Sequence, residues 1–255
     1  MDKTESFRSS PWHRFLRKIE PALYISPAFI VLTVVLVYPL GYALWLSFHQ
    51  WTLRTFKQGI PFIGFKNYID LFSNPDFLMT LRITITFVIL AVSIEFIIGM
   101  ALALLLNHEL KLKGFFRSMI LLPMMCTNVV IGLTWRLLLN YQYGLVNYYL
   151  GKIGILPIEW VSSPKVAMSS VVLVDVWNTT SFVALMFLAG LQSLPEEPFE
   201  AARIDGASKL QTFYYLTLPL LKPIILVALL WRFIDTFRIF DVIYLLTAGG
   251  PARAT

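Results

Sequence analysis

Residues 79–106 read MTLRITITFVILAVSIEFIIGMALALLL, and Arg82 and Glu95 are the only charged side chains in this stretch. A helix needs about 20 apolar residues to cross the ~30 Å hydrocarbon core of a bilayer, and this stretch is longer. Lipid offers the backbone no hydrogen-bond partner, so a spanning segment must be a helix or a strand of a closed barrel. Barrel strands alternate apolar and polar residues, and no such alternation is visible here. The stretch therefore predicts a transmembrane helix.

Four more apolar stretches of similar length occur in the chain. The composition agrees with them: 57% of the residues are hydrophobic and 14% are charged, and the mean hydropathy is +0.69. Soluble domains are nearer half apolar and a quarter charged. We therefore predict an all-α fold, a polytopic transmembrane helix bundle with five visible spans. The other four spans are predicted at residues 23–48, 115–139, 166–191 and 218–246.

Charge and reactive groups exclude several classes of function. The net charge is +6, but the basic residues lie at the borders of the apolar stretches, which argues against nucleic-acid binding. The single cysteine, Cys126, lies in an apolar stretch and is interpreted as a packing residue. The sequence contains no metal-ligand spacing, no phosphate-binding glycine loop and no nucleophile with a base. We expect no metal or cofactor on this chain and no enzymatic activity.

The chain opens with a polar, basic segment. The apolar stretch after it is too long for a signal peptide and lacks a cleavage site. We predict residues 1–22 as a cytoplasmic N-terminal segment and residues 23–255 as the transmembrane domain, with the N-terminus inside. The sequence ends in turn chemistry, GGPARAT at 249–255, so we expect a sixth span that it does not contain. The basic residues of the first segment are Lys3, Arg8, Arg14, Arg17 and Lys18.

Between the last two predicted spans lies a polar segment, residues 195–219, that reads PEEPFEAARIDGASKLQTFYYLTLP. Pro198 suits a first helical turn, and Gly206 suits the left-handed residue that ends a helix. Ser208 and Gln211 have the spacing of a capping box. The segment therefore predicts two short helices joined by a tight turn. A helix lying on lipid would be rich in Lys and Arg, whereas this one begins with three glutamates, which favours a protein partner.

Several motifs support a family resemblance. Glu200, Ala201 and Ala202, followed by Gly206 and by Leu218-Pro219, resemble the EAA loop of bacterial binding-protein-dependent ABC importer permeases. Four other stretches resemble the carbohydrate branch of that family, the maltose, trehalose and glycerol-phosphate importers. They are FIGFKNY at 62–68, LLP at 121–123, YGLVN at 143–147 and FDVIYLLTAGGP at 240–251.

The resemblance implies a type I ABC importer permease in the bacterial cytoplasmic (inner) membrane. It implies a second permease subunit, in a heterodimer, and two ATP-binding subunits that hold ATP and Mg. A periplasmic or lipid-anchored solute-binding protein would deliver a sugar, polyol or glycoside. The EAA coupling loop, 195–219, would contact the ATPase. The implied contact residues are Glu200, Ala201, Ala202, Gly206, Leu218 and Pro219.

The last predicted span carries Arg232, Asp235, Arg238 and Asp241. Charges at membrane depth cost roughly 2.5–3.5 kcal/mol each on insertion scales. Their signs alternate at a spacing of three, so neighbouring charges can meet on a helix. Each charge is rotated by about 60° around the helix axis from the one before it, so the four do not lie on one face. The helix must therefore be surrounded, line a wet cavity or break. A solute pathway and a structural ladder of ion pairs are both open interpretations.

A second polar group, Asp175, Trp177 and Asn178, lies in the predicted span 166–191. Aromatic faces beside hydrogen-bonding groups suit sugar rings, and packing is the alternative. Glu95 would pair with an intramembrane cation that the sequence does not identify. Two other functions stay open: an ion-driven secondary transporter, which would show internal repeats that we do not see, and a membrane enzyme or scaffold, for which no catalytic group is present.

Overall fold

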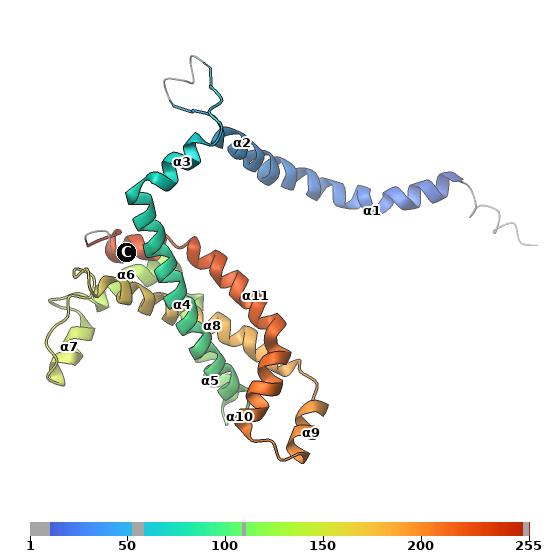
Figure 1. Cartoon of the computed structure of the whole chain (residues 1–255). Coiled ribbons are helices and arrows are strands. Elements are labelled where there is room, and N and C mark those ends of the chain that lie inside the picture. Colours follow the sequence, from blue (N-terminus) through green and yellow to red (C-terminus); the bar gives the residue numbers. More distant parts are fainter. Residues whose placement is uncertain (1–10, 53–58, 109–110, 252–254) are drawn as a thin grey trace, which may run out of the picture. The chain divides into compact units, whose positions relative to one another are not determined.

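The computed structural model describes residues 11–52, 59–108, 111–251 and 255 (Figure 1). The chain divides into two compact units, Met1–Leu78 and Met79–Thr255. The described residues are almost entirely helical, and their only β-type pairing is one isolated bridge between His49 and Phe62. The predicted all-α fold is confirmed.

The first unit contains one long apolar helix. Residues Glu20–Ser47 are long and apolar enough to cross a membrane, which confirms the predicted span 23–48. Asn67 donates from Nδ2 to the carbonyl oxygens of Ser47 and His49 at 2.8 and 3.0 Å, and so ties the next helix to the end of this one. Lys3 and Arg8 lie outside the described residues. The elements are α1 (Pro11–Leu32), the π-helical turn η2 (Thr33–Val37), α2 (Tyr38–Ser47) and α3 (Lys66–Ser73).

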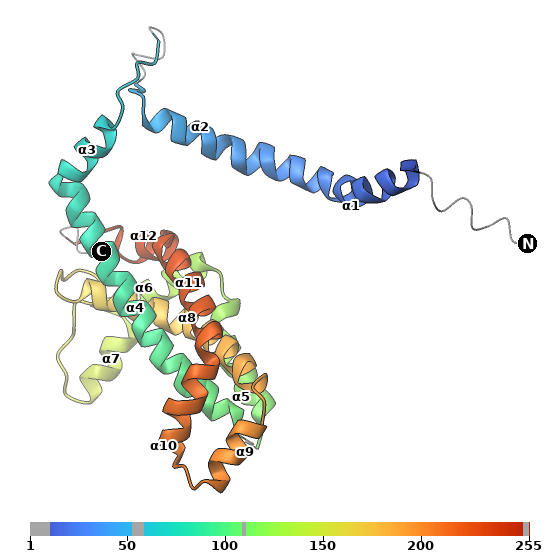
Figure 2. The same ribbon diagram turned by 45° about the vertical axis from the view of Figure 1, so that its right-hand side comes forward.

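The second unit is a bundle of helices. The polar loop, which contains α9 and α10, lies at one end of this bundle (Figure 2). The long apolar helices α4 and α8 confirm the predicted spans 79–106 and 166–191. In order, the elements are α4 (Pro75–Asn107), α5 (Lys113–Leu121), the 3-10 turn η4 (Pro123–Met125), α6 (Asn128–Leu138), α7 (Leu145–Lys152), α8 (Ala167–Gln192), α9 (Glu197–Ile204), α10 (Lys209–Thr212), the π-helical turn η5 (Phe213–Thr217), α11 (Leu218–Phe237) and α12 (Asp241–Thr247).

The bundle packs around α8, whose apolar side chains are the most buried of the long helices. One core cluster includes Phe87 and Val174, and a second includes Phe187 and Leu221. A Cβ atom at Gly99 of α4 would lie 2.8 Å from a methyl carbon of Val183 on α8. Because small residues let membrane helices approach closely, Gly99 sets the close contact of α4 with α8.

The predicted span at 115–139 is not one continuous helix. The structure divides these residues among α5, η4 and α6, and only four helices of the described residues are long and apolar enough to cross a membrane. Pro123 has no backbone N–H to continue the helix. Cys126 and Thr127 then adopt extended backbone conformations before α6 begins. Composition alone does not register this break, because residues 119–126 carry no polar or charged side chain.

The predicted span 218–246 is also divided. Helix α11 ends at Phe237, and Arg238 caps it by donating its backbone N–H to the Asp235 carbonyl at 3.0 Å. Helix α12 follows as a separate element and packs on α6. Arg136 of α6 donates from Nη1 to the Leu245 carbonyl at 3.2 Å. A break was one of the three solutions that the spacing of the charges required, and the structure adopts it.

Candidate functional site

The polar loop has the predicted two-helix form. Helix α9 starts with Pro198 in its first turn and ends at Ile204. Gly206 follows with φ +76°, a left-handed conformation that costs glycine little. The N–H of Ala207 donates to the Ala202 carbonyl at 2.9 Å, which closes the end of the helix as left-handed caps do. The sequence signal for a turn at Gly206 is confirmed.

The second helix of the loop begins with the predicted capping box. The Ser208 N–H donates to Gln211 Oε1 at 2.8 Å, and the Gln211 N–H donates to Ser208 Oγ at 3.3 Å. From α10 the chain continues as one helix through η5 into α11, over Lys209–Phe237. The loop is therefore not a flexible tether. Its second half, from Lys209 on, is the first part of the membrane-spanning helix Lys209–Phe237.

The residues that the family motif selects lie on or beside the loop surface. Glu200 and Ala201 are exposed on α9, and Ala202 is half-buried. Pro219 is exposed in the first turn of α11, while Leu218 is half-buried there. The structure therefore presents the acidic and small residues of α9 outward and uses the Leu-Pro pair to enter the span.

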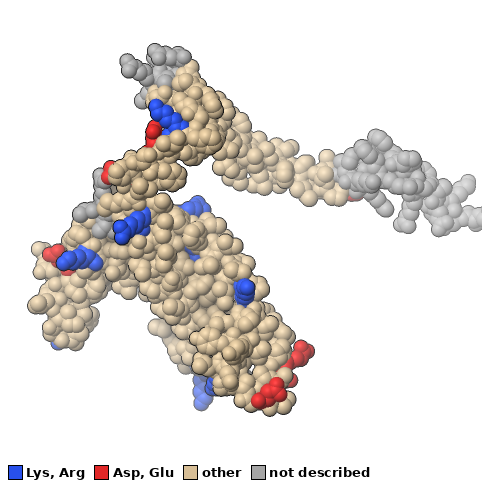
Figure 3. Space-filling view, in the orientation of Figure 1, with Lys and Arg blue, Asp and Glu red and all other residues tan. Residues whose placement is uncertain are grey.

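Apolar side chains are exposed on the same loop. Ile204 is 86% exposed and Tyr215 is 77% exposed, and Leu210 and Tyr214 are also open. Acidic side chains gather at the α9 end of this unit (Figure 3). Single exposed apolar residues are ordinary, but several beside an acidic helix form a surface with the chemistry of a protein contact.

Behind α9 lies a cavity of about 610 Å³. It is bordered by the ends of α4 and α8 and by α9, and Asn107, Glu200 and Arg203 are among its lining residues. Helix α9 is therefore separated from the bundle over much of its inner side. Such a helix can be reached by a partner without displacing the core.

The second polar region is a cluster of charged side chains inside the bundle. Arg232 of α11 is 1% exposed, Glu95 of α4 is 0% exposed and Asp175 of α8 is 3% exposed. Arg232 donates from Nε to Glu95 Oε2 at 2.7 Å and from Nη2 to Glu95 Oε1 at 2.8 Å. The same Nη2 lies 3.0 Å from Asp175 Oδ2. One guanidinium thus links three helices.

The third nitrogen of Arg232 is also bound. Its Nη1 donates to Oδ2 of Asp235, one turn later on α11, at 2.6 Å, and the Asp235 side chain is 58% exposed. Thr179 donates to Glu95 Oε1 at 2.7 Å. Buried charges are tolerated when they are paired and hydrogen-bonded, and this cluster meets both conditions. A carboxylate in a span is costly, so the sequence singles out Glu95. Its partner cannot be predicted from spacing.

Of the two interpretations of the alternating charges, the ladder of ion pairs forms only at its first step among the described residues. Arg232 and Asp235 pair as the spacing predicts. Arg238 and Asp241 are exposed, and neither forms an ion pair with a described residue. The physical reason is the helix end at Phe237, which removes the regular geometry that would have brought Asp235, Arg238 and Asp241 into line.

Trp177 of α8 packs against α6. Trp177 is 43% exposed, and its ring meets Trp135 of α6 edge to face at 5.5 Å. Asn178 is half-buried, and its buried Oδ1 has no hydrogen-bond partner among the described residues. Asp175, although two positions earlier, faces Arg232. The structure therefore separates the three residues that the sequence grouped.

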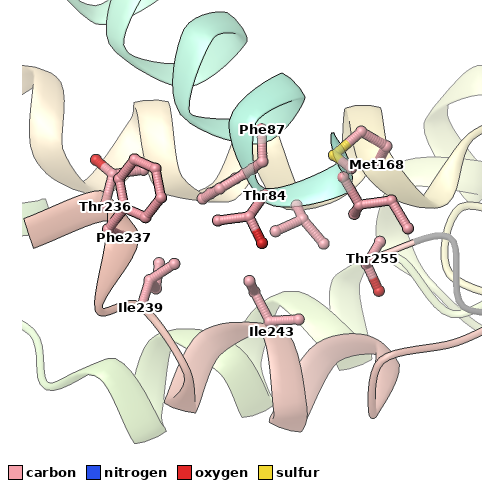
Figure 4. Close-up of a pocket in the computed structure, with 10 residues that line it drawn as sticks. Thr84, Phe87, Met168, Thr236, Phe237, Ile239, Ile243 and Thr255 are labelled. Carbon is pink, nitrogen blue, oxygen red and sulfur yellow. The ribbon is translucent and has the colours of Figure 1, made fainter. Parts of the chain in front are cut away.

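A small cavity lies where α11 gives way to α12 (Figure 4). It measures about 90 Å³ and is lined by residues of α4, α8, α11 and α12, including Thr84, Phe87, Met168 and Thr236. A wider hollow of about 360 Å³ shares Thr84 and Ile239 with it. Ligand pockets usually measure about 300–1,000 Å³, so only the wider hollow approaches the volume of a small solute.

The comparisons with known proteins agree with this architecture. Residues 95–255 match the family model for the binding-protein-dependent transport system inner membrane component. The chain therefore belongs to this family of transporter permeases. Its relatives there are permeases of carbohydrate importers, which confirms the branch predicted from the sequence.

Two relatives illustrate the degree of sequence identity to permeases of known importers. The trehalose/maltose transport system permease protein MalF of Thermococcus litoralis is 42% identical over 233 aligned positions, covering 91% of this chain and 78% of the relative. The sulfoquinovosyl glycerol transport system permease protein SmoG of Agrobacterium fabrum is 37% identical over 257 aligned positions, covering 100% and 82%. The crystal structure of a bacterial ABC transporter involved in the import of the acidic polysaccharide alginate has a similar fold. Its TM-score is 0.78 at 22% identity, over 96% of this chain and 82% of that one.

Proposed function

We propose that this chain is the membrane-spanning permease subunit of an ATP-driven importer for a sugar or a related polyol or glycoside. The observation that carries the proposal is the exposed acidic and apolar loop that continues, as one helix, into a membrane span. Such a loop can accept a displacement from a protein below the membrane and pass it to the bundle. The chain belongs to a family of transporter permeases, which supports the same conclusion.

The loop 195–219 would bind an ATPase subunit through Glu200, Ala201, Ala202 and the turn at Gly206. ATP and Mg would be held by two such subunits and not by this chain. The exposed Ile204 and Tyr215 provide apolar contact area beside the acidic α9, which supports a protein partner over a lipid surface. This arrangement requires the loop and the N-terminus to lie in the cytoplasm.

A second permease subunit, in a heterodimer, and an extracytoplasmic solute-binding protein would complete the complex. The apolar surface of α11 is largely exposed in the chain alone, so lipid or another subunit must cover it. One structural relative is described as a bacterial alginate ABC transporter in complex with an alginate pentasaccharide-bound periplasmic protein. A binding protein of that kind is the delivery partner we propose here.

The solute route would follow the polar positions of α8 and α11. Trp177 and Asp235 offer an exposed aromatic face and an exposed carboxylate. The unpaired amide oxygen of Asn178 is buried in this conformation and would reach a solute only after the helices move. Arg238 and Asp241 lie exposed at the break between α11 and α12. Asp175 and Arg232 are buried in this conformation, so they would shape the route from behind.

Affinity purification of the tagged chain from its native host, in mild detergent, tests the proposal. We expect an ATP-binding subunit and a second permease to co-purify. We also expect vesicles that contain the complex to accumulate radiolabelled trehalose, maltose or sn-glycerol 3-phosphate only with ATP and the cognate binding protein. Absence of an ATP-binding subunit, or uptake by this chain alone that stops when ion gradients are dissipated, would contradict the proposal.

A further inference from the structure

The most specific contact between the long helices is made by Arg232. Its guanidinium reaches Glu95 on α4 and Asp175 on α8 at 2.7–3.0 Å, and both carboxylates are almost completely buried. These three side chains, Glu95, Asp175 and Arg232, are called the latch below. The donors of a guanidinium lie in one rigid plane, so the bonds fix the angle and the depth of α11 as well as its distance from its neighbours.

One member of the latch, Arg232, lies on the same helix as the second half of the loop. The helix that starts at Lys209 runs without a gap to Phe237 and includes Arg232. At about 1.5 Å per residue, Arg232 lies roughly 35 Å along it from Lys209. The loop and Arg232 are therefore joined by one continuous helix, which includes the π-helical turn η5 and Pro223. Of the two other helices of the latch, α8 ends at Gln192 before α9 begins at Glu197, and α4 is not adjacent to the loop in sequence.

The chemistry of the latch favours discrete positions of α11. A shift by one residue along the helix axis moves the Arg232 backbone by about 1.5 Å, about half the length of these bonds, so the bonds to both carboxylates must rearrange. A buried ion pair adds little net stability compared with apolar residues of the same volume, so its use here is better explained by specificity of position. Packed helices with two discrete arrangements are the usual carriers of coupling between distant sites.

We propose that Arg232 is a positioning residue that, with Glu95 and Asp175, holds α11 in its resting position until the ATPase drives the loop. The latch opposes the displacement of α11, so it suppresses ATP hydrolysis in the resting complex. Opening the latch frees α11 from α4 and α8 together, because one guanidinium serves both. This proposal rests on the function proposed above, in which the loop contacts an ATPase.

The test uses the purified complex of this chain with its second permease and its ATPase, reconstituted in vesicles without solute or binding protein. The central variant replaces all three charges, Glu95→Gln, Asp175→Asn and Arg232→Met, so that no unpaired buried charge remains. Basal ATP hydrolysis by this variant should rise roughly tenfold over the wild type, within the usual range of allosteric coupling. Lys222→Gln is the matched control, because Lys222 is an exposed cation on α11 that forms no ion pair with a described residue. Its basal hydrolysis should equal that of the wild type.

The outcomes separate the latch from the function on which it rests. If the wild-type chain does not co-purify with an ATPase, the proposed function fails. If the complex assembles and the triple variant hydrolyses ATP at or below the wild-type basal rate, the latch is contradicted. If the triple variant does not assemble, Glu95→Gln alone decides by the same criterion, with a smaller rise of roughly threefold expected from the loss of one charge.

Discussion

The loop at 195–219 and the charge cluster in the bundle are both built from polar residues, but their hydrogen bonds differ in the sequence separation of the residues that they join. In the loop, Ser208 and Gln211 bond across three positions of sequence. In the cluster, Arg232 reaches Glu95 across 137 positions and Asp175 across 57. The loop therefore forms its shape from local sequence, whereas the cluster exists only once the helices have packed. Local bonds suit a surface that a partner must recognise, and long-range bonds suit the fixing of helices against one another.

The largest loss in the free energy of unfolding should follow removal of the Arg232 cation from the cluster. Arg232→Met leaves two buried carboxylates without a counter-charge, which costs about 3–5 kcal/mol when one partner of a buried pair is lost. Thermal unfolding of the detergent-solubilised chain should show this loss. Adding Glu95→Gln and Asp175→Asn should restore most of it. A single variant as stable as the wild type would show that the cluster contributes nothing to packing.

A smaller effect should follow from separating the helices that carry the cluster. Gly99 lies one turn after Glu95 on α4, and a Cβ atom there would lie 2.8 Å from a methyl carbon of Val183. Gly99→Ala should destabilise the bundle by about 1–3 kcal/mol through overpacking. Gly41→Ala is the matched control, because nothing lies within 4 Å of a Cβ at Gly41 in α2. That change should be neutral or stabilising, since alanine is the better helix former.

In the loop, a substitution at Gly206 should alter the coupling of ATP hydrolysis to solute uptake, with little effect on packing in the bundle. Gly206 adopts φ +76°, which costs other residues roughly 1–2 kcal/mol. Gly206→Arg should therefore distort the turn between α9 and α10 and lower solute uptake per ATP by roughly tenfold, the equivalent of 1.4 kcal/mol. Membrane insertion should be unchanged, and the free energy of unfolding should fall by no more than this local strain. Normal coupled uptake in the complete complex would remove Gly206 from the contact.

The smallest effect should come from the capping box. Ser208→Ala removes the acceptor for the Gln211 N–H, and loss of such a cap typically costs about 1 kcal/mol. Hydrogen exchange of the α10 amides should become faster, while exchange in α4 and α8 stays as in the wild type. Equal acceleration in all three helices would mean that the loop and the bundle are not separable as their bonding indicates.

The same contrast explains which features could be predicted from the sequence. Pro198, Gly206 and the pair Ser208–Gln211 act on their own neighbourhoods, so the two-helix loop followed from spacing alone. The partner of Glu95 did not, because helix packing decides which cation lies opposite it. The break at Pro123 was missed because apolar residues continue on both sides of it. The helix end after Phe237 likewise removed Arg238 and Asp241 from a ladder that regular geometry would have produced.

The central claim is that the loop, and not the opposite end of the bundle, meets an ATPase. Site-directed cross-linking tests it most directly. In a Cys126→Ser background, Ala201→Cys places a thiol on the exposed side of α9, which follows the end of α8. Leu156→Cys places one at a position that is 83% exposed in the segment that leads into the start of α8. We predict that a thiol-to-amine cross-linker joins the first variant, and not the second, to the ATP-binding subunit in import-competent membranes. An active complex in which Ala201→Cys gives no such product, or in which Leu156→Cys gives as much, would contradict the account.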